Sequence, residues 1–404
     1  MAGSSFGTIF KITTWGESHG KALGVVIDGC PSGLELSEAD IQKYLDRRKP
    51  GTSALTTQRK ENDEVEILSG IFEGKTTGTP ISLLVRNTAQ ISSDYGDIAT
   101  YYRPGHADYT FDQKYGFRDY RGGGRSSGRE TIGRVAAGAI ACKILEQLGV
   151  TVKAYTKSIG PIEIDPSSYD ESLRLTTPTA MPDPKANEET IAYLAKAREA
   201  MDSVGGCMEC VVDGLPAGIG DPVFEKLDAN LAKAIMSIGA VKAVEIGDGV
   251  QVSKRFGSEN NDAFISCKAQ TCMNTEASCQ ESSKSVLDSK ITKMHPSNNI
   301  SKLTNHAGGI LGGISDGSQI VVRAHVKPPP SIYQTQHTVN QQGEEIEIQI
   351  KGRHDPIIVP RAVVVMECMT ALTILDAMML NATAKLETLK LVYKAKKIGS
   401  SNAQ

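Results

Sequence analysis

The sequence has few aromatic residues, almost no net charge and no targeting leader. Its 404 residues include one Trp, 12 Tyr and 8 Phe, which argues against a stacking surface for single-stranded nucleic acid. The 44 Lys and Arg residues nearly balance the 47 Asp and Glu residues, for a formal charge of −3, so we expect no general affinity for polyanions. No stretch approaches the roughly 18 uninterrupted apolar residues of a membrane span, so we also expect no membrane association.

The N-terminal segment and the cysteines indicate a cytoplasmic protein. MAGSSFGTIFKITTWGESHG has neither a charged region before an apolar core nor the Arg- and Ser-rich composition of a transit leader. Cys207 and Cys210 form a CxxC pair, but no second CxxC or His pair follows at zinc-ligand spacing. Because the surrounding segment alternates like a strand, the pair is expected to be buried reduced thiols, with no metal bound.

The order of the expected elements favours an α+β protein. The length allows one large domain or two to three ordinary ones. Ser37 and Asp40 have the spacing of a capping box at a helix start, and Gly149 is a typical residue after a helix end. We predict helices at residues 37–45, 132–148, 188–201, 221–236 and 363–385. We predict strands at residues 23–28, 206–212, 320–326 and 345–350. They do not alternate as strict βαβ units, which disfavours a doubly wound sheet.

Residues 266–301 differ from their surroundings. The segment is rich in Ser, Asn, Lys, Thr and Cys and has little apolar periodicity. This composition predicts a flexible surface insertion within a single catalytic domain that spans residues 1–404. A regulatory or partner-binding role for the insertion is the alternative.

Two glycine-rich segments carry candidate chemistry. In residues 15–20, WGESHG, glycines on both sides expose His19 at a tight bend, where an imidazole can serve as a proton donor; an ordinary surface His is the alternative. In residues 121–131, RGGGRSSGRET, glycines, arginines and serines precede a predicted helix start. Backbone N–H groups at a helix N-terminus bind phosphate, and arginines add charged contacts. The spacing matches neither a P-loop nor a dinucleotide fingerprint, and a flexible linker remains the alternative.

Further cations and proton carriers lie elsewhere in the chain. Residues 103–134 hold seven basic and four acidic residues, a local excess of positive charge that includes the loop of His106. Arg47 and Arg48 begin a run without acids up to residue 60, and KGRHDP at 351–356 contains Arg353 and Asp355. The residues alone therefore indicate an enzyme with a cationic, glycine-lined site for phosphorylated anions.

Taken together, these segments resemble the chorismate synthase family over nearly the whole chain. The resemblance rests on ordered blocks that include FGTIFKITTWGESHG, DGCPSG, DRRKPGTS, YRPGHADYTF, GGGRSSGRETIGRVAAG, DSVGG, SIGAVKAVEIGDG, NHAGGILGGISDG and KGRHDP. It implies a β-α-β sandwich, with central helices between two antiparallel sheets, and a homotetramer. It also implies a phosphate lyase of the shikimate pathway that uses reduced FMN to convert 5-enolpyruvylshikimate 3-phosphate into chorismate without net redox change.

The resemblance also implies roles for individual residues. His19 would protonate the departing phosphate, His106 would lie against the flavin, and Asp355 would handle the proton at flavin N5. Arg48 and Arg47 would bind substrate. The expected FMN-binding residues are Arg125, Ser126, Ser127, Arg129, Gly239, Ala240, Gly312, Lys327, Ser331 and Arg353.

Three departures from the family pattern and two alternatives remain. Ala54 stands where a basic residue is usual, Pro329 and Pro330 stand where hydroxyl residues are common, and the 266–301 insertion resembles the expanded loops of some eukaryotic members. The sequence does not decide whether NADPH or an external reductant supplies the reduced flavin. A flavin-dependent oxidoreductase and an RNA-binding scaffold are the alternative functions.

Overall fold

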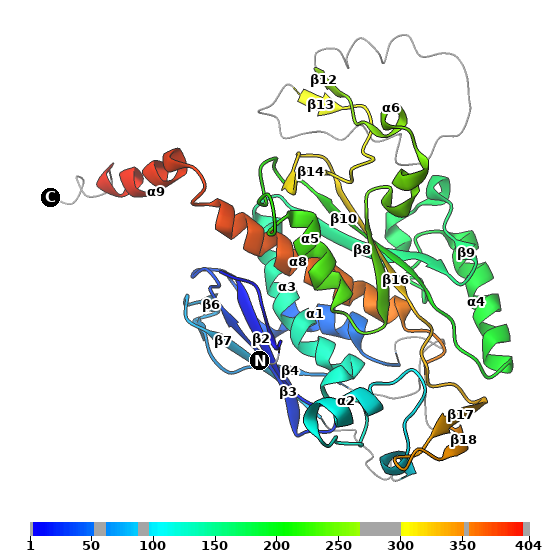
Figure 1. Ribbon diagram of the computed structural model, residues 1–404. Coiled ribbons are helices and arrows are strands. Elements are labelled where there is room, and N and C mark those ends of the chain that lie inside the picture. The colour runs from blue at the N-terminus through cyan, green and yellow to red at the C-terminus, as the bar shows by residue number, and fades with distance from the viewer. Residues whose placement is uncertain (1–2, 52–61, 88–96, 267–299, 351–354, 399–404) are drawn as a thin grey trace.

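Two antiparallel sheets enclose a layer of helices (Figure 1). The computed structural model describes residues 3–51, 62–87, 97–266, 300–350 and 355–398. The first sheet has the order β1 (Ser5–Phe6), β2 (Lys11–Gly16), β3 (Ala22–Asp28), β7 (Ile81–Arg86) and β4 (Val65–Ile67). The second has the order β11 (Val241–Ile246), β16 (Ile320–Val326), β10 (Gly206–Asp213), β8 (Thr151–Ile159) and β9 (Ile162–Glu163).

The central layer is built from α1 (Glu38–Arg48), α3 (Thr131–Gln147), α5 (Leu227–Met236) and α8 (Val359–Asn381). Helix α3 contacts β3 of the first sheet and β8 of the second, while α8 packs on β8, β10 and the other three helices. Every pairing within the two sheets is antiparallel. The predicted sandwich is therefore confirmed.

Helix α8 is long and apolar enough to cross a membrane by length and composition. Arg361, Glu367 and Asp376 interrupt its apolar residues, so the sequence prediction of no uninterrupted apolar span still holds for it. Within the described chain, 78% of its most apolar window is buried inside the protein, which is the pattern of a core helix surrounded on all sides. Near its C-terminal end, the Asp376 carboxylate accepts hydrogen bonds from the backbone amides of Thr8, Ile9 and Phe10 at 2.7–2.9 Å.

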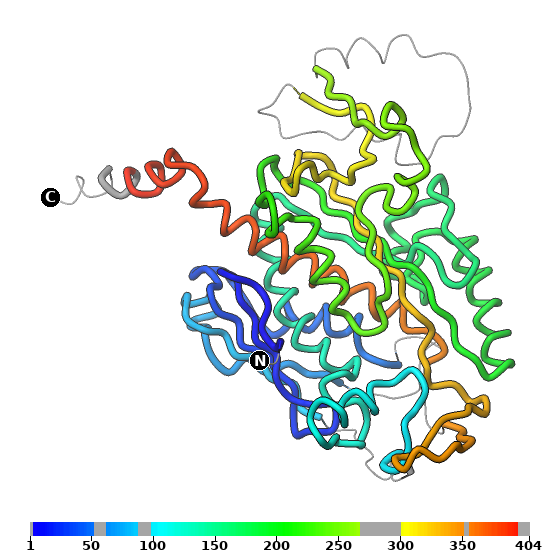
Figure 2. The backbone as a smooth tube through the Cα atoms, in the orientation of Figure 1, coloured from blue at the N-terminus to red at the C-terminus, as the bar shows by residue number. Residues whose placement is uncertain are grey.

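Smaller elements surround the sandwich. Helix α9 projects away from the body of the molecule (Figure 2). The remaining strands and α-helices are β5 (Ile71–Phe72), β6 (Lys75–Thr76), α2 (Asp108–Tyr115), α4 (Pro184–Glu199), α6 (Gly257–Asn260), β12 (Phe264–Ser266), β13 (Ile300–Lys302), β14 (Ile310–Leu311), β15 (Ile314–Ser315), β17 (Thr335–Val339), β18 (Glu345–Gln349) and α9 (Leu386–Ile398).

Several sequence predictions hold in detail. The capping box of Ser37 and Asp40 opens α1, and Gly149 follows α3 with a φ of +76°. Cys207 and Cys210 are free and buried in β10. Burial raises the pKa of the Cys207 thiol to about 12, so the pair is suited to packing and not to redox chemistry.

The base of the insertion is a two-stranded ribbon. Strands β12 and β13 pair antiparallel, with Ser266 opposite Ile300, and Ser301 is 1% exposed. The predicted limits 266–301 are therefore too wide, because residues at both ends belong to strands. The remainder of the expected insertion, 267–299, lies outside the described residues.

Candidate active site

The glycine-rich loop packs against His19. Residues 121–130 form two short 3₁₀ turns, η3 (Gly124–Ser126) and η4 (Gly128–Glu130), directly before α3. Gly122 has a φ of +90°, and a Cβ atom there would lie 2.5 Å from His19 Cε1. Only a glycine allows this backbone to approach the imidazole so closely, so the two glycine-rich segments meet.

His19 lies in the tight turn between β2 and β3. The Gly20 amide donates to the Glu17 carbonyl at 3.1 Å, and Ser18 Oγ lies 3.1 Å from His19 Nδ1. The imidazole is half-buried. The structure confirms the predicted placement at a bend, and the proton-donor role remains a prediction.

Arg125 and the two serines fix the shape of the loop. The Arg125 guanidinium donates to Thr14 Oγ1 at 2.7 Å and to the Gly16 carbonyl at 3.1 Å, both on β2. Ser126 Oγ donates to the Gly123 carbonyl at 2.7 Å, and Ser127 Oγ accepts from the Arg129 amide at 3.3 Å. The loop is therefore held in one conformation by its own polar groups before any ligand is considered.

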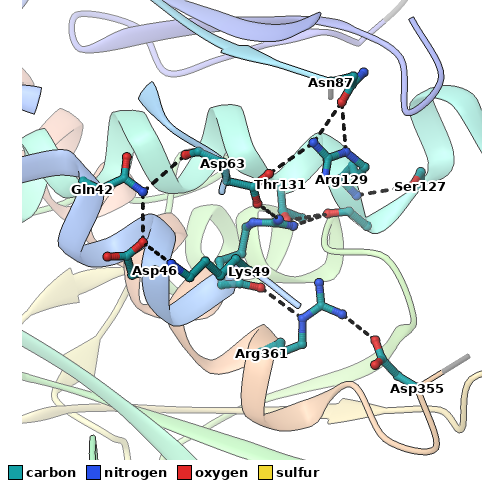
Figure 3. Close-up of polar contacts among 12 residues, drawn as sticks. Gln42, Asp46, Lys49, Asp63, Asn87, Ser127, Arg129, Thr131, Asp355 and Arg361 are labelled. Carbon is teal, nitrogen blue, oxygen red and sulfur yellow. Dashed lines mark hydrogen bonds and ion pairs between the residues drawn. The ribbon is translucent and has the colours of Figure 1, made fainter. Parts of the chain in front are cut away.

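Two arginines share one buried carboxylate. Arg48, at the end of α1, forms an ion pair with Asp63 Oδ2. Arg129 Nη2 lies 3.2 Å from Asp63 Oδ1 (Figure 3). Arg48 is 2% exposed, and its Nε has no hydrogen-bond partner within the described part of the chain. An unsatisfied buried donor of this kind is suited to an anionic ligand.

Asp355 is connected to Arg48 through Arg361. The Asp355 carboxylate pairs with Arg361 Nη1, and Arg361 Nε donates to the Arg48 carbonyl at 3.0 Å (Figure 3). Burial lowers the pKa of the Arg361 guanidinium, against the attraction of Asp355 and with added repulsion from Arg48. Sequence reasoning missed Arg361; its only signal is an arginine in the first turn of α8, six residues after Asp355.

His106 is held in a single tautomer. Its Nδ1 lies 2.9 Å from the Pro104 carbonyl, which can only accept, so Nδ1 carries the proton. Nε2 then accepts from Ser331 Oγ at 2.9 Å. Burial lowers the pKa of His106 to about 4, and the nearby charge of Arg103 adds to the effect. The imidazole is therefore neutral at neutral pH.

The predicted residues around Lys327 meet the His106 loop. Lys327 Nζ donates to the Gly105 carbonyl at 2.9 Å, and the Lys327 amide donates to the Ala240 carbonyl at 2.9 Å. Ala240 has a φ of +71°, an uncommon conformation for a residue with a side chain. The structure therefore brings Ala240, Lys327, Ser331 and His106 together.

The two prolines shape the same loop. Pro330 lies against Gly105, and the Pro329 carbonyl accepts from Ser203 Oγ at 2.6 Å. The next residue, Val204, donates its amide to the Pro356 carbonyl at 2.9 Å. This link places the segment of Asp355 beside the segment of Lys327, so the cationic and histidine-containing parts belong to one site.

Other residues that the sequence analysis named have different surroundings or lie outside the described part of the chain. Arg47 forms a bidentate pair with Glu367 of α8, at 2.6 and 3.0 Å, away from Asp63. Gly312 lies in the β14–β15 turn next to the start of α5, since Gly313 accepts from the Leu227 amide. Gly239 and Ala240 follow the C-terminal end of α5. Because this helix is about 15 Å long, Gly312 lies apart from them. Arg353 and Ala54 lie outside the described residues.

A helical layer between two antiparallel sheets, carrying a cationic, glycine-lined site with two imidazoles and a carboxylate, defines an enzyme that acts on phosphorylated anions. The family model described as chorismate synthase matches residues 10–379. The chain is 60% identical over 394 residues to a chorismate synthase of Lachnospira eligens, covering 98% of this chain and 100% of the relative. It is 52% identical over 381 residues to one of Methanocella arvoryzae, covering 94% and 95%.

A solved crystal structure of chorismate synthase is similar with a TM-score of 0.68 and 29% identity, covering 97% of this chain and 98% of that one. The chain belongs to the chorismate synthase family, as its sequence blocks predicted. It is therefore a carbon–oxygen lyase of aromatic amino acid biosynthesis, which eliminates phosphate from 5-enolpyruvylshikimate 3-phosphate to give chorismate.

Proposed function

We propose that this site binds reduced FMN beside 5-enolpyruvylshikimate 3-phosphate and that its own side chains carry the protons of the 1,4-elimination. The observation that carries the proposal is the pair of guanidinium groups on Asp63, linked on one side to the turn of His19 and on the other to Asp355. Anion binding and proton carriers thus converge within one connected set of contacts.

Arg48 and Arg129 bind the anionic groups of the substrate. The sequence suggested FMN binding for Arg129, but we move it to the substrate because it shares Asp63 with Arg48. Asp63 orients both guanidinium groups but neutralises only one charge. Arg48 Nε remains a buried donor whose desolvation is offset when an anion accepts from it. Arg47, the second residue proposed for substrate binding, has its guanidinium group paired with Glu367.

The second part of the site fits the cofactor. The contacts of His106, Lys327, Ser331 and Ala240 form one cluster, and residues 125–127 lie in the glycine-rich loop before α3. We assign FMN binding to both groups, with Gly239 beside Ala240. Reduced FMN, when bound, supplies electron density as the phosphate leaves and is not consumed.

The protein's own residues move the protons. His19 protonates the departing phosphate oxygen, so its imidazole acts as the general acid. Asp355 would accept the proton released at flavin N5 and become a neutral carboxyl group, and Arg361 would stabilise the carboxylate form before that transfer. His106 stays neutral and holds its proton on Nδ1, so it presents no charge to the flavin ring.

The finer features of the family are also proposed for this chain: a homotetramer, a cytoplasmic location, and NADPH or an external reductant as the source of reduced flavin. An assay with NADPH and FMN alone, in air, distinguishes the two sources. Activity under these conditions supports self-reduction, and activity only with dithionite-reduced FMN supports an external reductant.

Phosphate release tests the main proposal. With photoreduced FMN under anaerobic conditions, the protein is expected to release one phosphate per chorismate formed, whereas oxidised FMN gives no product. Flavin oxidation in proportion to turnover would instead indicate an oxidoreductase. RNA binding with a steep salt dependence would indicate a polyanion-binding protein, which the charge of −3 disfavours.

A further inference from the structure

Asn87 joins the arginine pair to the turn of His19. It follows β7, and its side-chain amide makes four hydrogen bonds. Asn87 Oδ1 accepts from Arg129 Nε at 3.1 Å and Nη2 at 2.8 Å (Figure 3). Asn87 Nδ2 donates to the carbonyls of Glu17 at 3.1 Å and Gly20 at 2.7 Å. These two carbonyls lie on either side of His19 in the sequence.

Only a carboxamide of this length satisfies both partners. The guanidinium group of Arg129 requires an acceptor, whereas the two carbonyls require donors, and the Asn side chain supplies two lone pairs and two N–H groups. The backbone N–H of Asn87 also donates to the Lys21 carbonyl at 3.1 Å. The turn between β2 and β3 is therefore held at three carbonyls by one residue.

The contacts continue on the far side of Arg129. Arg129 reaches Asp63, and Asp63 pairs with Arg48. A continuous series of hydrogen bonds thus runs from Arg48 to the turn of His19. A shift of Asn87 changes the separation between the anion-binding groups and the imidazole without removing either.

We propose that Asn87 is a positioning residue that sets where the His19 imidazole lies relative to the substrate phosphate bound by Arg48 and Arg129. The inference rests on the role of His19 as general acid in the proposed function. A misplacement of about 1 Å between reacting groups costs roughly 10²-fold in rate, which is the scale of effect expected here.

The test variant is Asn87→Asp. Aspartate keeps the size of the side chain and its acceptors for Arg129, but it turns a carboxylate toward the two carbonyls that Asn87 Nδ2 now binds. We expect kcat to fall about 10²-fold, while the KM for substrate and the affinity for FMN change far less. Asn87→Ala removes the same contacts without repulsion and serves if the Asp variant does not fold.

Asn230→Asp is the matched control. Asn230 lies on α5, and its Nδ2 also donates to a carbonyl, that of Glu225, at 3.3 Å. The Asn230→Asp variant makes the same chemical replacement at a half-buried position outside the site, and we expect wild-type kcat. Equal losses in the two Asp variants would overturn the inference, because they would show a general effect of added charge.

A double-mutant cycle with His19→Ala identifies the route of the effect. If Asn87 acts through His19, then Asn87→Asp adds no further loss of kcat in the His19→Ala background. Losses that multiply would overturn the inference while the proposed function stands. If the wild-type enzyme releases no phosphate, it is the proposed function that fails.

A readout independent of activity completes the test. Hydrogen exchange followed by mass spectrometry is expected to show faster exchange in peptides covering residues 16–21 of Asn87→Asp, and unchanged exchange there in Asn230→Asp. Unchanged exchange in Asn87→Asp contradicts the inference, whatever the activity.

Discussion

Burial keeps the imidazole of His106 neutral, and this has a consequence for stability. The pKa of His106 is lowered to about 4 in the folded chain, whereas an unfolded His titrates near 6.5. Between these values the unfolded state binds more protons, so the free energy of unfolding contributed by His106 decreases as the pH falls from about 6.5 to 4. Urea unfolding at pH 7 and pH 5 is expected to show a smaller loss of stability for His106→Gln than for the wild type. Equal losses would contradict the neutral, buried imidazole.

Asp355 provides a second test at the residue scale. Asp355→Asn keeps an acceptor for Arg361 but removes the negative charge, so we expect normal folding and FMN binding. Losing a general base typically costs roughly 10²–10⁴-fold in rate, which should appear in single-turnover measurements with reduced FMN. Wild-type turnover in this variant would remove Asp355 from the proton path.

The sequence predicted part of the site. The residues that it predicted differ from those that it missed in how far away their partners lie along the chain. The turn of His19 and the loop of Arg125 were found because glycines mark close backbone approach within a few residues. Asp63 and Asn87 were missed because their partners include residues far along the chain, and an isolated polar residue carries no spacing signal. Arg361 lies only six residues from Asp355, but its contact with the Arg48 carbonyl is equally distant in sequence. Nor did the sequence indicate the partner of Arg47: its basic neighbours predict a cationic pocket, and in the fold its guanidinium group pairs with Glu367.

At the scale of elements, the central helices cross at unusually short range. A Cβ atom on Gly138 of α3 would lie 2.2 Å from Cys368 Cβ of α8. Gly138→Ala is therefore expected to destabilise the fold by about 1–3 kcal/mol through overpacking, although Ala is the better helix former. Gly257→Ala in α6, where no atom lies within 4 Å, is the control and should be neutral or slightly stabilising. Thermal melts of the two variants provide the measurement, and equal melting temperatures would contradict the close crossing.

Helix boundaries show where sequence reasoning fails at this scale. The prediction for α4 began at 188, but Asp183 caps a helix that starts at Pro184. The prediction for α5 was wrong by six residues, since the helix begins at Leu227. Helix α8 starts earlier than predicted because Pro360 occupies its first turn, where a missing N–H is tolerated. It ends at Asn381, before the predicted limit of 385.

At the scale of the whole molecule, Glu367 holds the layers together. This α8 carboxylate, 2% exposed, binds Arg47 of α1, Arg174 at 3.0 Å and the Ala154 amide of β8 at 3.0 Å. Glu367→Gln removes the counter-charge of Arg47 and leaves Arg174 with Glu171 alone, so we expect a loss of about 3–5 kcal/mol in the free energy of unfolding. Glu66→Gln, which breaks the exposed pair with Arg86, should cost at most about 1 kcal/mol. Denaturant unfolding compares them, and similar losses would refute the structural role of Glu367.

The contact between Asp376 and the amides of residues 8–10 has a consequence for biosynthesis. Residues 8–10 leave the ribosome early, whereas α8, whose Asp376 they bind, emerges last among the central helices. A nascent chain therefore carries β8 and β10 without the helix that packs on them until translation is almost finished, and exposed apolar surface of this kind favours aggregation. We expect the newly made polypeptide to depend on chaperones until residue 381 is free, and to acquire protease resistance in a single late step.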